Sequence, residues 1–465
     1  MKRVLAILLA LTLLTTFLVA CSADEPTPPA ADATGDDIAD DTAGDEADDT
    51  ADVEEAAPPT ADGEPFEVSI WLAVNEAVGN FYVDIMDRVA ANHPGLTWNM
   101  TVHSWEDLGM MLIPAINAGA GPDVFAIGDF SSADMALVIE AGLLADLTPF
   151  AERYNWQDRY PDWWWEGILD ISDGNLVRMH LGSTALGVFY NKAIFEENGI
   201  SVPQTYDEFL AICQILQDAG VQPILLAGMD GWPYFHYQSM FIAAFDGRET
   251  WDNIIDNGGS FNSPGVVAAK TAFLDLINVG FIDSNINAIE YGDMNTMFTA
   301  MIPESPAMVM TGTWMMQEYY NFMGDNVGFF ILPSAIGGAP MPVASIADGW
   351  AINAASEHKD ISAEFLNILF SSEFAPYAAK SGMIIAFTDI DEDVVRSWAD
   401  VNPLMRDAIV GFMNATNIAP NIDVLVPATI NEATLENMQR LGGGLQDVET
   451  TVANIAEAYY EAFSR

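Results

Sequence analysis

Three aromatic side chains stand in segments that read as loops or turns rather than as core. Trp232 and Tyr234 follow Gly231, and Trp314 follows the turn sequence Thr311-Gly-Thr. The flat face of an aromatic ring accommodates the axial C–H groups of a sugar, whose hydroxyls need paired donors and acceptors. A carboxylate suits such hydroxyls because it accepts from two of them at once. These residue types are typical of a saccharide-binding surface, and the alternative is that the rings pack in a core.

Sequence patterns of common enzymes are absent from the chain. The five histidines have no metal-ligand spacing, and there is no His-Glu-x-x-His, Gly-x-Ser-x-Gly or phosphate-binding loop. The stretch Asp389 to Asp393 resembles the start of a calcium loop but lacks its glycine and terminal glutamate. A carboxylate pair of the glycosidase type is expected by chance in so acidic a chain. We therefore expect no catalytic residues, no metal and no cofactor.

The composition favours a two-domain protein with strongly acidic character. The 465 residues include 15 Lys and Arg against 68 Asp and Glu, a net charge of −53, and 51% are hydrophobic. This length exceeds one ordinary domain. So few cations exclude nucleic acid as a partner and make binding to an anionic membrane through a basic patch unfavourable. Cys213 lies in an apolar helical run and is predicted to be a buried core residue rather than a nucleophile.

The N-terminal region has the pattern of a secretion signal followed by a tether. Lys2 and Arg3 precede the apolar run from Val4 to Ala20, and Leu18-Val-Ala-Cys21 resembles a bacterial lipobox. Residues 22–64 contain no Lys or Arg and are rich in Ala, Asp, Glu, Thr and Pro. Such a segment is expected to be disordered and extended by self-repulsion. We therefore predict a signal peptide over 1–20, lipid on Cys21, and a tether over 21–65.

Alternating strand and helix patterns from Phe66 onward predict an α/β fold. The segment around Val68 to Leu72 alternates as a strand, and helical patterns separate it from later strands. Ligands of such sheets bind at the carboxyl ends of the strands. The expected rim carries Asn75, Glu76 and Asp129. Further along the chain, Thr205 and Glu208 form a capping box that opens a helix.

Several blocks of sequence together resemble one known family. These blocks are Gly119-Ala-Gly-Pro-Asp-Val-Phe125, Leu181 to Phe209 with its Tyr190-Asn-Lys, and Ala344 to Asn353. They resemble the family 1 extracellular solute-binding proteins, the carbohydrate receptors of bacterial ABC importers. The resemblance implies an α/β, two-lobed, type II periplasmic-binding-protein-like fold, in which mostly parallel sheets flanked by helices surround a hinged cleft. Lobe 1 would hold residues 66–183 and about 349–395, and lobe 2 about 184–348 and about 396–465.

The resemblance also implies a function and a site. The chain would be a monomeric lipoprotein on the outer face of the cytoplasmic membrane that captures a mono- or oligosaccharide by hinge closure and delivers it to permease subunits. Trp232, Tyr234 and Trp314 would reach the cleft. Hinge strands are expected near Gly182 to Thr184 and Ile346 to Gly349. Thr184, Asp348 and Trp350 would thus lie by the cleft, with Asp129 and Asp348 as partners for hydroxyls.

Other functions remain open at this point. One is a receptor for another small solute, such as a polyol, a glycerol phosphodiester or a peptide. The others are a lipid-anchored glycan-active enzyme and an adhesive or sensory protein. Recovery of a bound ligand unchanged in mass would separate a receptor from an enzyme.

Overall fold

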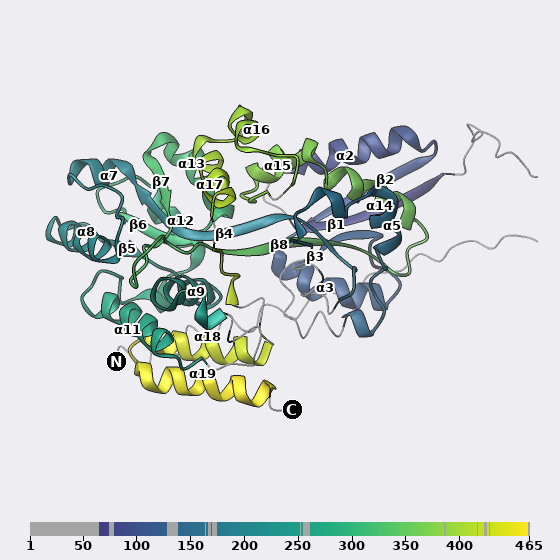
Figure 1. Cartoon of the computed structure of the whole chain (residues 1–465). Helices are drawn as coiled ribbons and strands as arrows, with labels where there is room; N and C mark the ends of the chain where they lie inside the picture. Colours follow the sequence, from purple (N-terminus) through teal and green to yellow (C-terminus); the bar gives the residue numbers. More distant parts are fainter. Residues whose placement is uncertain are drawn as a thin grey trace, which may run out of the picture. The chain divides into compact units, whose positions relative to one another are not determined.

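The computed structural model describes residues 65–73, 79–127, 138–162, 164–165, 169, 174–251, 253, 261–385, 387–415, 417–422, 426 and 428–463 (Figure 1). Several sequence predictions lie outside these residues. They are the signal peptide, Cys21 and the tether, and three predicted site residues, Asn75, Glu76 and Asp129. The side chain of Asp348 is also outside the description, although its backbone is part of a strand.

An eight-stranded mixed sheet organises the described part of the chain, with the order β2-β1-β3-β8-β4-β6-β5 and β7 paired to β4. The strands are β1 (Phe66–Ala73), β2 (Leu96–His103), β3 (Val124–Ile127), β4 (Met179–Asn191), β5 (Ile224–Leu225), β6 (Met308–Gly312), β7 (Val327–Phe330) and β8 (Val343–Ile352). The pairs β1–β2, β1–β3 and β5–β6 are parallel. The pairs that involve β4 or β8 are antiparallel.

The two long strands β4 and β8 join the two ends of this sheet (Figure 1). The first part of β4 pairs with β8, and its second part pairs with β6 and β7. The far end of β8 pairs with β3. The two segments predicted as hinges are direct strand partners, because Gly182 pairs with Ala347 and Ser183 with Ile346.

Helices connect the strands along the chain and also follow the last strand, β8. They are α2 (Gly79–Asn92), α3 (Trp105–Asn117), α5 (Thr148–Tyr154), α7 (Lys192–Glu197), α8 (Tyr206–Asp218), α9 (Pro233–Asp246), α11 (Pro264–Asn278), α12 (Tyr291–Thr299), α13 (Met316–Met323), α14 (Lys359–Leu369), α15 (Ala375–Lys380), α16 (Glu392–Ser397), α17 (Pro403–Met413), α18 (Ala428–Gly442) and α19 (Val448–Phe463). The predicted cap of α8 is confirmed, since Thr205 Oγ1 accepts from the N–H of Glu208 at 3.2 Å. The Glu208 carboxylate in turn accepts from the N–H of Gln204 at 2.7 Å.

Buried apolar side chains form two clusters. One includes β1, β3, α14 and α17, and the other includes α8, α9, α11 and the C-terminal helices α18 and α19. Cys213 belongs to the second cluster and is 0% exposed, which confirms its prediction as a buried residue. Burial raises the pKa of its thiol to about 12, so this thiol is inert at neutral pH.

Asp123, from the Gly-Pro-Asp block, fastens the beginning of β3 to its neighbours. Its Oδ2 accepts from the backbone N–H and the hydroxyl of Ser69 in β1, at 2.8 and 2.9 Å. Its Oδ1 accepts from the hydroxyl of Ser356, beyond the end of β8, at 2.6 Å. The aspartate thus satisfies donors from two other segments.

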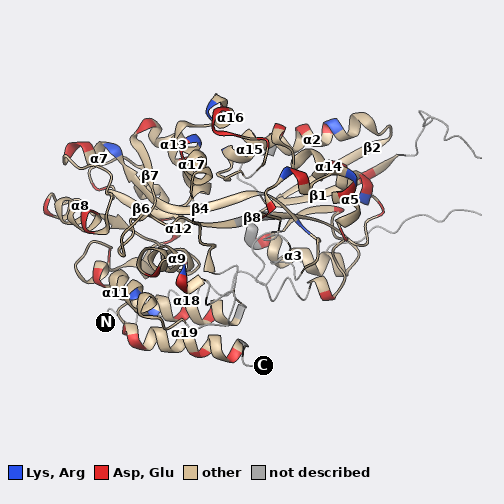
Figure 2. Cartoon of the chain, viewed as in Figure 1, with Lys and Arg blue, Asp and Glu red and all other residues tan. Residues whose placement is uncertain are grey.

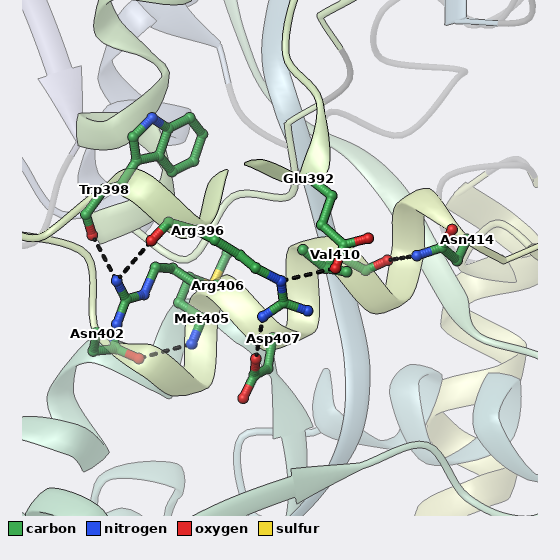
Figure 3. A network of polar contacts seen from close by, with 9 residues as sticks. All are labelled: Glu392, Arg396, Trp398, Asn402, Met405, Arg406, Asp407, Val410 and Asn414. Atoms are coloured by element: carbon green, nitrogen blue, oxygen red, sulfur yellow. Dashed lines mark hydrogen bonds and ion pairs between the residues drawn. The ribbon is translucent and has the colours of Figure 1, made fainter. Parts of the chain in front are cut away.

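A polar network connects α16 to α17 (Figure 3). Asn402 caps α17, because its Oδ1 accepts from the N–H of Met405 at 2.8 Å. The amide nitrogen of the same side chain donates to Gln317 of α13 at 3.0 Å. On the neighbouring helix α16, Arg396 pairs with Glu392 one turn earlier.

Candidate functional site

Three elements bring aromatic side chains together on the β5–β6 side of the sheet. Gly231 has a φ of 81°, a backbone conformation that glycine adopts at little cost, and it turns the chain into α9. Trp232 immediately precedes this helix, and His236 follows one turn later on the same side. Tyr291 is the first residue of α12. Trp314 lies in the 3-10 turn Thr313–Met315 that follows β6.

We name Trp232, His236, Tyr291 and Trp314 the aromatic wall. The ring of Trp232 lies 4.6 Å from that of Tyr291, 5.1 Å from His236 and 6.4 Å from Trp314. His236 is 5.2 Å from Trp314. All four residues are partly exposed. The wall is therefore a contiguous group of aromatic residues, each of which is partly accessible to solvent.

Trp314 and Tyr291 of the wall are hydrogen-bonded to each other. The indole N–H of Trp314 donates to the Tyr291 hydroxyl at 2.7 Å, and this hydroxyl lies 2.6 Å from Thr311 Oγ1. Burial raises the pKa of Tyr291 to about 12, so the phenol stays protonated. The Trp314 N–H therefore already has an acceptor within the wall.

The wall carries no formal charge at neutral pH. Burial among the rings lowers the pKa of His236 to about 3, which keeps the imidazole neutral. Asp230 is exposed and stabilises the start of α12, because its Oδ2 accepts from the N–H of Tyr291 at 2.7 Å. Other acidic residues lie on outer helices such as α8, and β4 has none (Figure 2). An uncharged ring surface is suited to a neutral ligand.

The predicted site residues take different places. Trp232 and Trp314 come together in the wall. Tyr234 is 0% exposed, and its hydroxyl donates to Asn287 at 2.8 Å within the second apolar cluster. Trp350 is 2% exposed in β8, among the rings of the first cluster. Thr184 is partly exposed on β4, at the pairing with β8.

Two members of the wall, His236 and Tyr291, are not among the site residues predicted from the sequence. His236 had a local signal, because it stands four residues after Trp232 in a helix that Pro233 begins. Tyr291 had none, since only the tertiary fold brings α12 beside α9 and the end of β6. Long-range placement of this kind is not encoded in a local pattern.

The described part of the chain has neither a cluster of metal-ligating side chains nor a helix that could span a membrane. Within it, no group of three or more His, Cys, Asp or Glu side chains could hold a metal ion. No helix among these residues is long and apolar enough to span a membrane.

Solved structures share this fold. A chitin oligosaccharide binding protein superposes with a TM-score of 0.73 at 21% identity, covering 87% of this chain and 100% of that one. The binding protein RafE in complex with raffinose has a TM-score of 0.65 at 18% identity, covering 85% and 99%. A cyclic α-maltosyl-1,6-maltose binding protein from Arthrobacter globiformis has a TM-score of 0.66 at 18% identity, covering 86% and 99%.

Sequence comparisons lead to the same group of proteins. A multiple sugar-binding protein of Streptococcus mutans is 22% identical over 297 residues, 62% of this chain and 68% of that protein. A putative binding protein of Brucella abortus is 23% identical over 240 residues, 50% of this chain and 55% of that protein. Residues 73–376 match the family model described as bacterial extracellular solute-binding protein. With most of its fold and more than half of its length matched in this way, the chain belongs to the bacterial extracellular solute-binding protein family.

Proposed function

We propose that this protein is the receptor of an ABC importer and that it binds a neutral saccharide at the aromatic wall. The observation that carries the proposal is the wall itself, four partly exposed aromatic residues without a formal charge. Ring faces of this kind match the C–H faces of sugars. The relatives named for sugar binding support the same ligand class.

The proposed mechanism is capture by closure of two lobes. Lobe 1 comprises residues 66–183 and about 349–395, and lobe 2 comprises about 184–348 and about 396–465. The pairing of β4 with β8 supports a hinge there, because these strands join the two ends of the sheet. The ligand bridges the lobes and shifts the population toward the closed form, which the permease recognises. Lobe 1 contributes Asn75, Glu76 and Asp129, and the crossing strands contribute Thr184 and Asp348.

The proposed location is the outer face of the cytoplasmic membrane, with the protein as a monomer. Lipid on Cys21 after removal of residues 1–20 anchors the chain, and residues 21–65 hold the folded part away from the bilayer. The lipobox-like Leu18-Val-Ala-Cys21 supports this anchoring. Mass spectrometry of the N-terminal peptide from membranes tests it, and an unmodified Cys21 in a mature chain would refute it.

A thermal-shift screen of the full chain in detergent tests the ligand class. The ligand sets are mono- and oligosaccharides, polyols, amino acids and peptides. Binding to the folded state raises Tm by mass action. We expect a rise with one class of saccharide, greatly reduced in Trp232→Ala and retained in Tyr460→Ala, which removes an exposed ring outside the wall.

Other results of the screen would overturn part or all of the proposal. A rise only with peptides, amino acids or polyols would leave the family assignment in place and refute the saccharide. No rise with any ligand, for protein verified to be free of bound solute, would refute the receptor function. Conversion of the saccharide to a product of different mass would indicate an enzyme.

A further inference from the structure

Three backbone segments meet directly beneath Trp314. They are β4 at residues 182–185, the turn at 312–314, and the segment at 382–384 that follows α15. We name this meeting point the Thr313 junction. It joins one strand of the β4–β8 crossing to a ring of the aromatic wall.

The hydroxyl of Thr313 holds the junction together. The side chain is 0% exposed, and its Oγ1 donates to the carbonyl of Gly382 at 2.5 Å. The same oxygen accepts from the N–H of Ala185 in β4 at 3.2 Å. One buried hydroxyl therefore satisfies a donor of one segment and an acceptor of another.

Backbone packing at the junction leaves no room for adjustment. Gly382 has a φ of 88°, and a Cβ there would lie 2.2 Å from the carbonyl oxygen of Thr313. Ser183 and Ile384 exchange both backbone hydrogen bonds, at 2.8 and 2.6 Å. A Cβ on Gly182 would lie 2.8 Å from the Ile384 oxygen. Segment 382–384 is thus in direct backbone contact with both β4 and the turn.

The ring of Trp314 takes its orientation from this backbone. The indole lies across Gly312, where a Cβ would come within 1.9 Å of a ring carbon. Its N–H bonds to Tyr291, so the ring is held on two sides. A movement of the turn relative to β4 would therefore move the ring within the wall.

We propose that Thr313 is a positioning residue of the aromatic wall, whose hydroxyl couples the orientation of Trp314 to β4 and to segment 382–384. The proposal rests on the proposed function only for the identity of what the wall binds. Removal of the hydroxyl leaves the Ala185 N–H and the Gly382 carbonyl buried without this partner. Because unpaired buried polar groups are costly, the backbone shifts to bring them to other partners. The turn then loses its fixed relation to β4.

The experiment compares Thr313→Val, which keeps the shape and removes the hydroxyl, with Thr313→Ser, which keeps the hydroxyl. The full chain is labelled with 5-fluorotryptophan, and the Trp314 resonance among the twelve tryptophans is identified by its loss in Trp314→Phe. We expect Thr313→Val to shift and broaden this resonance. Thr313→Ser restores it, and the resonance of Trp156, buried in the first cluster, stays in place in both variants.

Affinity for the saccharide found in the screen is the second readout. Loss of one buried hydroxyl with two partners is expected to weaken binding about tenfold in Thr313→Val, and Thr313→Ser is expected to stay within about twofold of the wild type. A role in stability alone would lower Tm without this specific effect on Trp314. Should Thr313→Val not fold, Thr313→Ala removes the same hydroxyl without added bulk and takes its place.

The two proposals fail in different ways. An unchanged Trp314 resonance in a folded variant without the hydroxyl would overturn the positioning role, whatever the ligand is. A shift in Thr313→Ser as large as in Thr313→Val would also overturn it. A wild type that binds no saccharide refutes the proposed function, and the fluorine resonance still decides the role of Thr313.

Discussion

Two groups of aromatic rings, each containing a tryptophan predicted for the site, differ in how they meet solvent. In the first apolar cluster, Trp350 lies 5.2 Å from Tyr82 and 5.4 Å from Phe365, and it is 2% exposed. Ring distances in the aromatic wall are similar, yet its members remain partly exposed. Ring spacing therefore does not distinguish these two groups, and exposure does.

The wall is also distinguished by hydrogen bonds between the polar atoms of its rings. Trp314 and Tyr291 bond to each other, and Tyr291 contacts Thr311 on β6. These two rings are thereby fixed in orientation although both residues remain partly exposed. Pre-orientation of this kind lowers the entropy lost on binding, because fewer side-chain rotamers are immobilised by the ligand. Burial of the core group stabilises the fold. The fixed orientation of the wall residues instead lowers the entropy that a bound ligand would cost.

The largest expected effect separates the two groups by stability. Trp350→Ala removes a fully packed ring, and we expect it to lower the free energy of unfolding by about 3–5 kcal/mol. Urea denaturation monitored by far-UV circular dichroism measures this, with Trp314→Ala as the matched change in the wall. Equal losses in the two variants would show that the wall tryptophan is a core residue as well.

Much of the fold could be predicted from the sequence, because interactions between residues close together in the chain specify it. Thr205 and Glu208 are found in the predicted capping arrangement, and the predicted helical run containing Cys213 is the buried helix α8. The predicted hinge segments are strand partners because both occur in long apolar strands. Patterns that depend on neighbours a few residues away are visible without a structure.

The orientation of side chains near the beginning of a helix was harder to predict from the sequence. The helix α9 begins at Pro233, so Tyr234 is already helical. Two residues along a helix differ by about 200° in direction, which turns Tyr234 away from Trp232, and four residues bring His236 back. If residues 231–236 are read as a loop, Tyr234 appears as accessible as Trp232. Tyr291 could not be placed at all without the tertiary fold.

The next effect tests the wall as a binding surface. We expect Trp232→Ala and Trp314→Ala each to weaken saccharide binding by about 1–3 kcal/mol, the scale of a lost aromatic contact. Isothermal titration calorimetry measures it, and Tyr460→Ala serves as the control with an exposed ring on α19. Wild-type affinity in both variants would mean that these rings pack without contacting ligand.

A smaller effect is expected from the hydrogen bond within the wall. Tyr291→Phe keeps the ring and removes the acceptor of the Trp314 N–H. We expect binding to weaken by about 1 kcal/mol, because the indole loses its anchor while the stacking surface remains. The same calorimetric titration measures the change. A loss as large as that of Trp314→Ala would show instead that the Tyr291 hydroxyl itself contacts the ligand.

The smallest expected effect concerns pH. A solvated histidine titrates near pH 6.5, but burial lowers the pKa of His236 to about 3, so the wall stays neutral. The unfolded chain then binds one proton more than the folded chain between these values, and the stability contributed by His236 is present above pH 6.5 and lost as pH falls toward 3. Affinity of the folded protein should nevertheless change by less than about twofold between pH 5.5 and 8. Calorimetry across this range measures it, with His236→Gln as the non-titrating control. A fall in affinity with a midpoint near pH 6.5, absent in His236→Gln, would mean that the imidazole is solvated and that the wall becomes charged in acid.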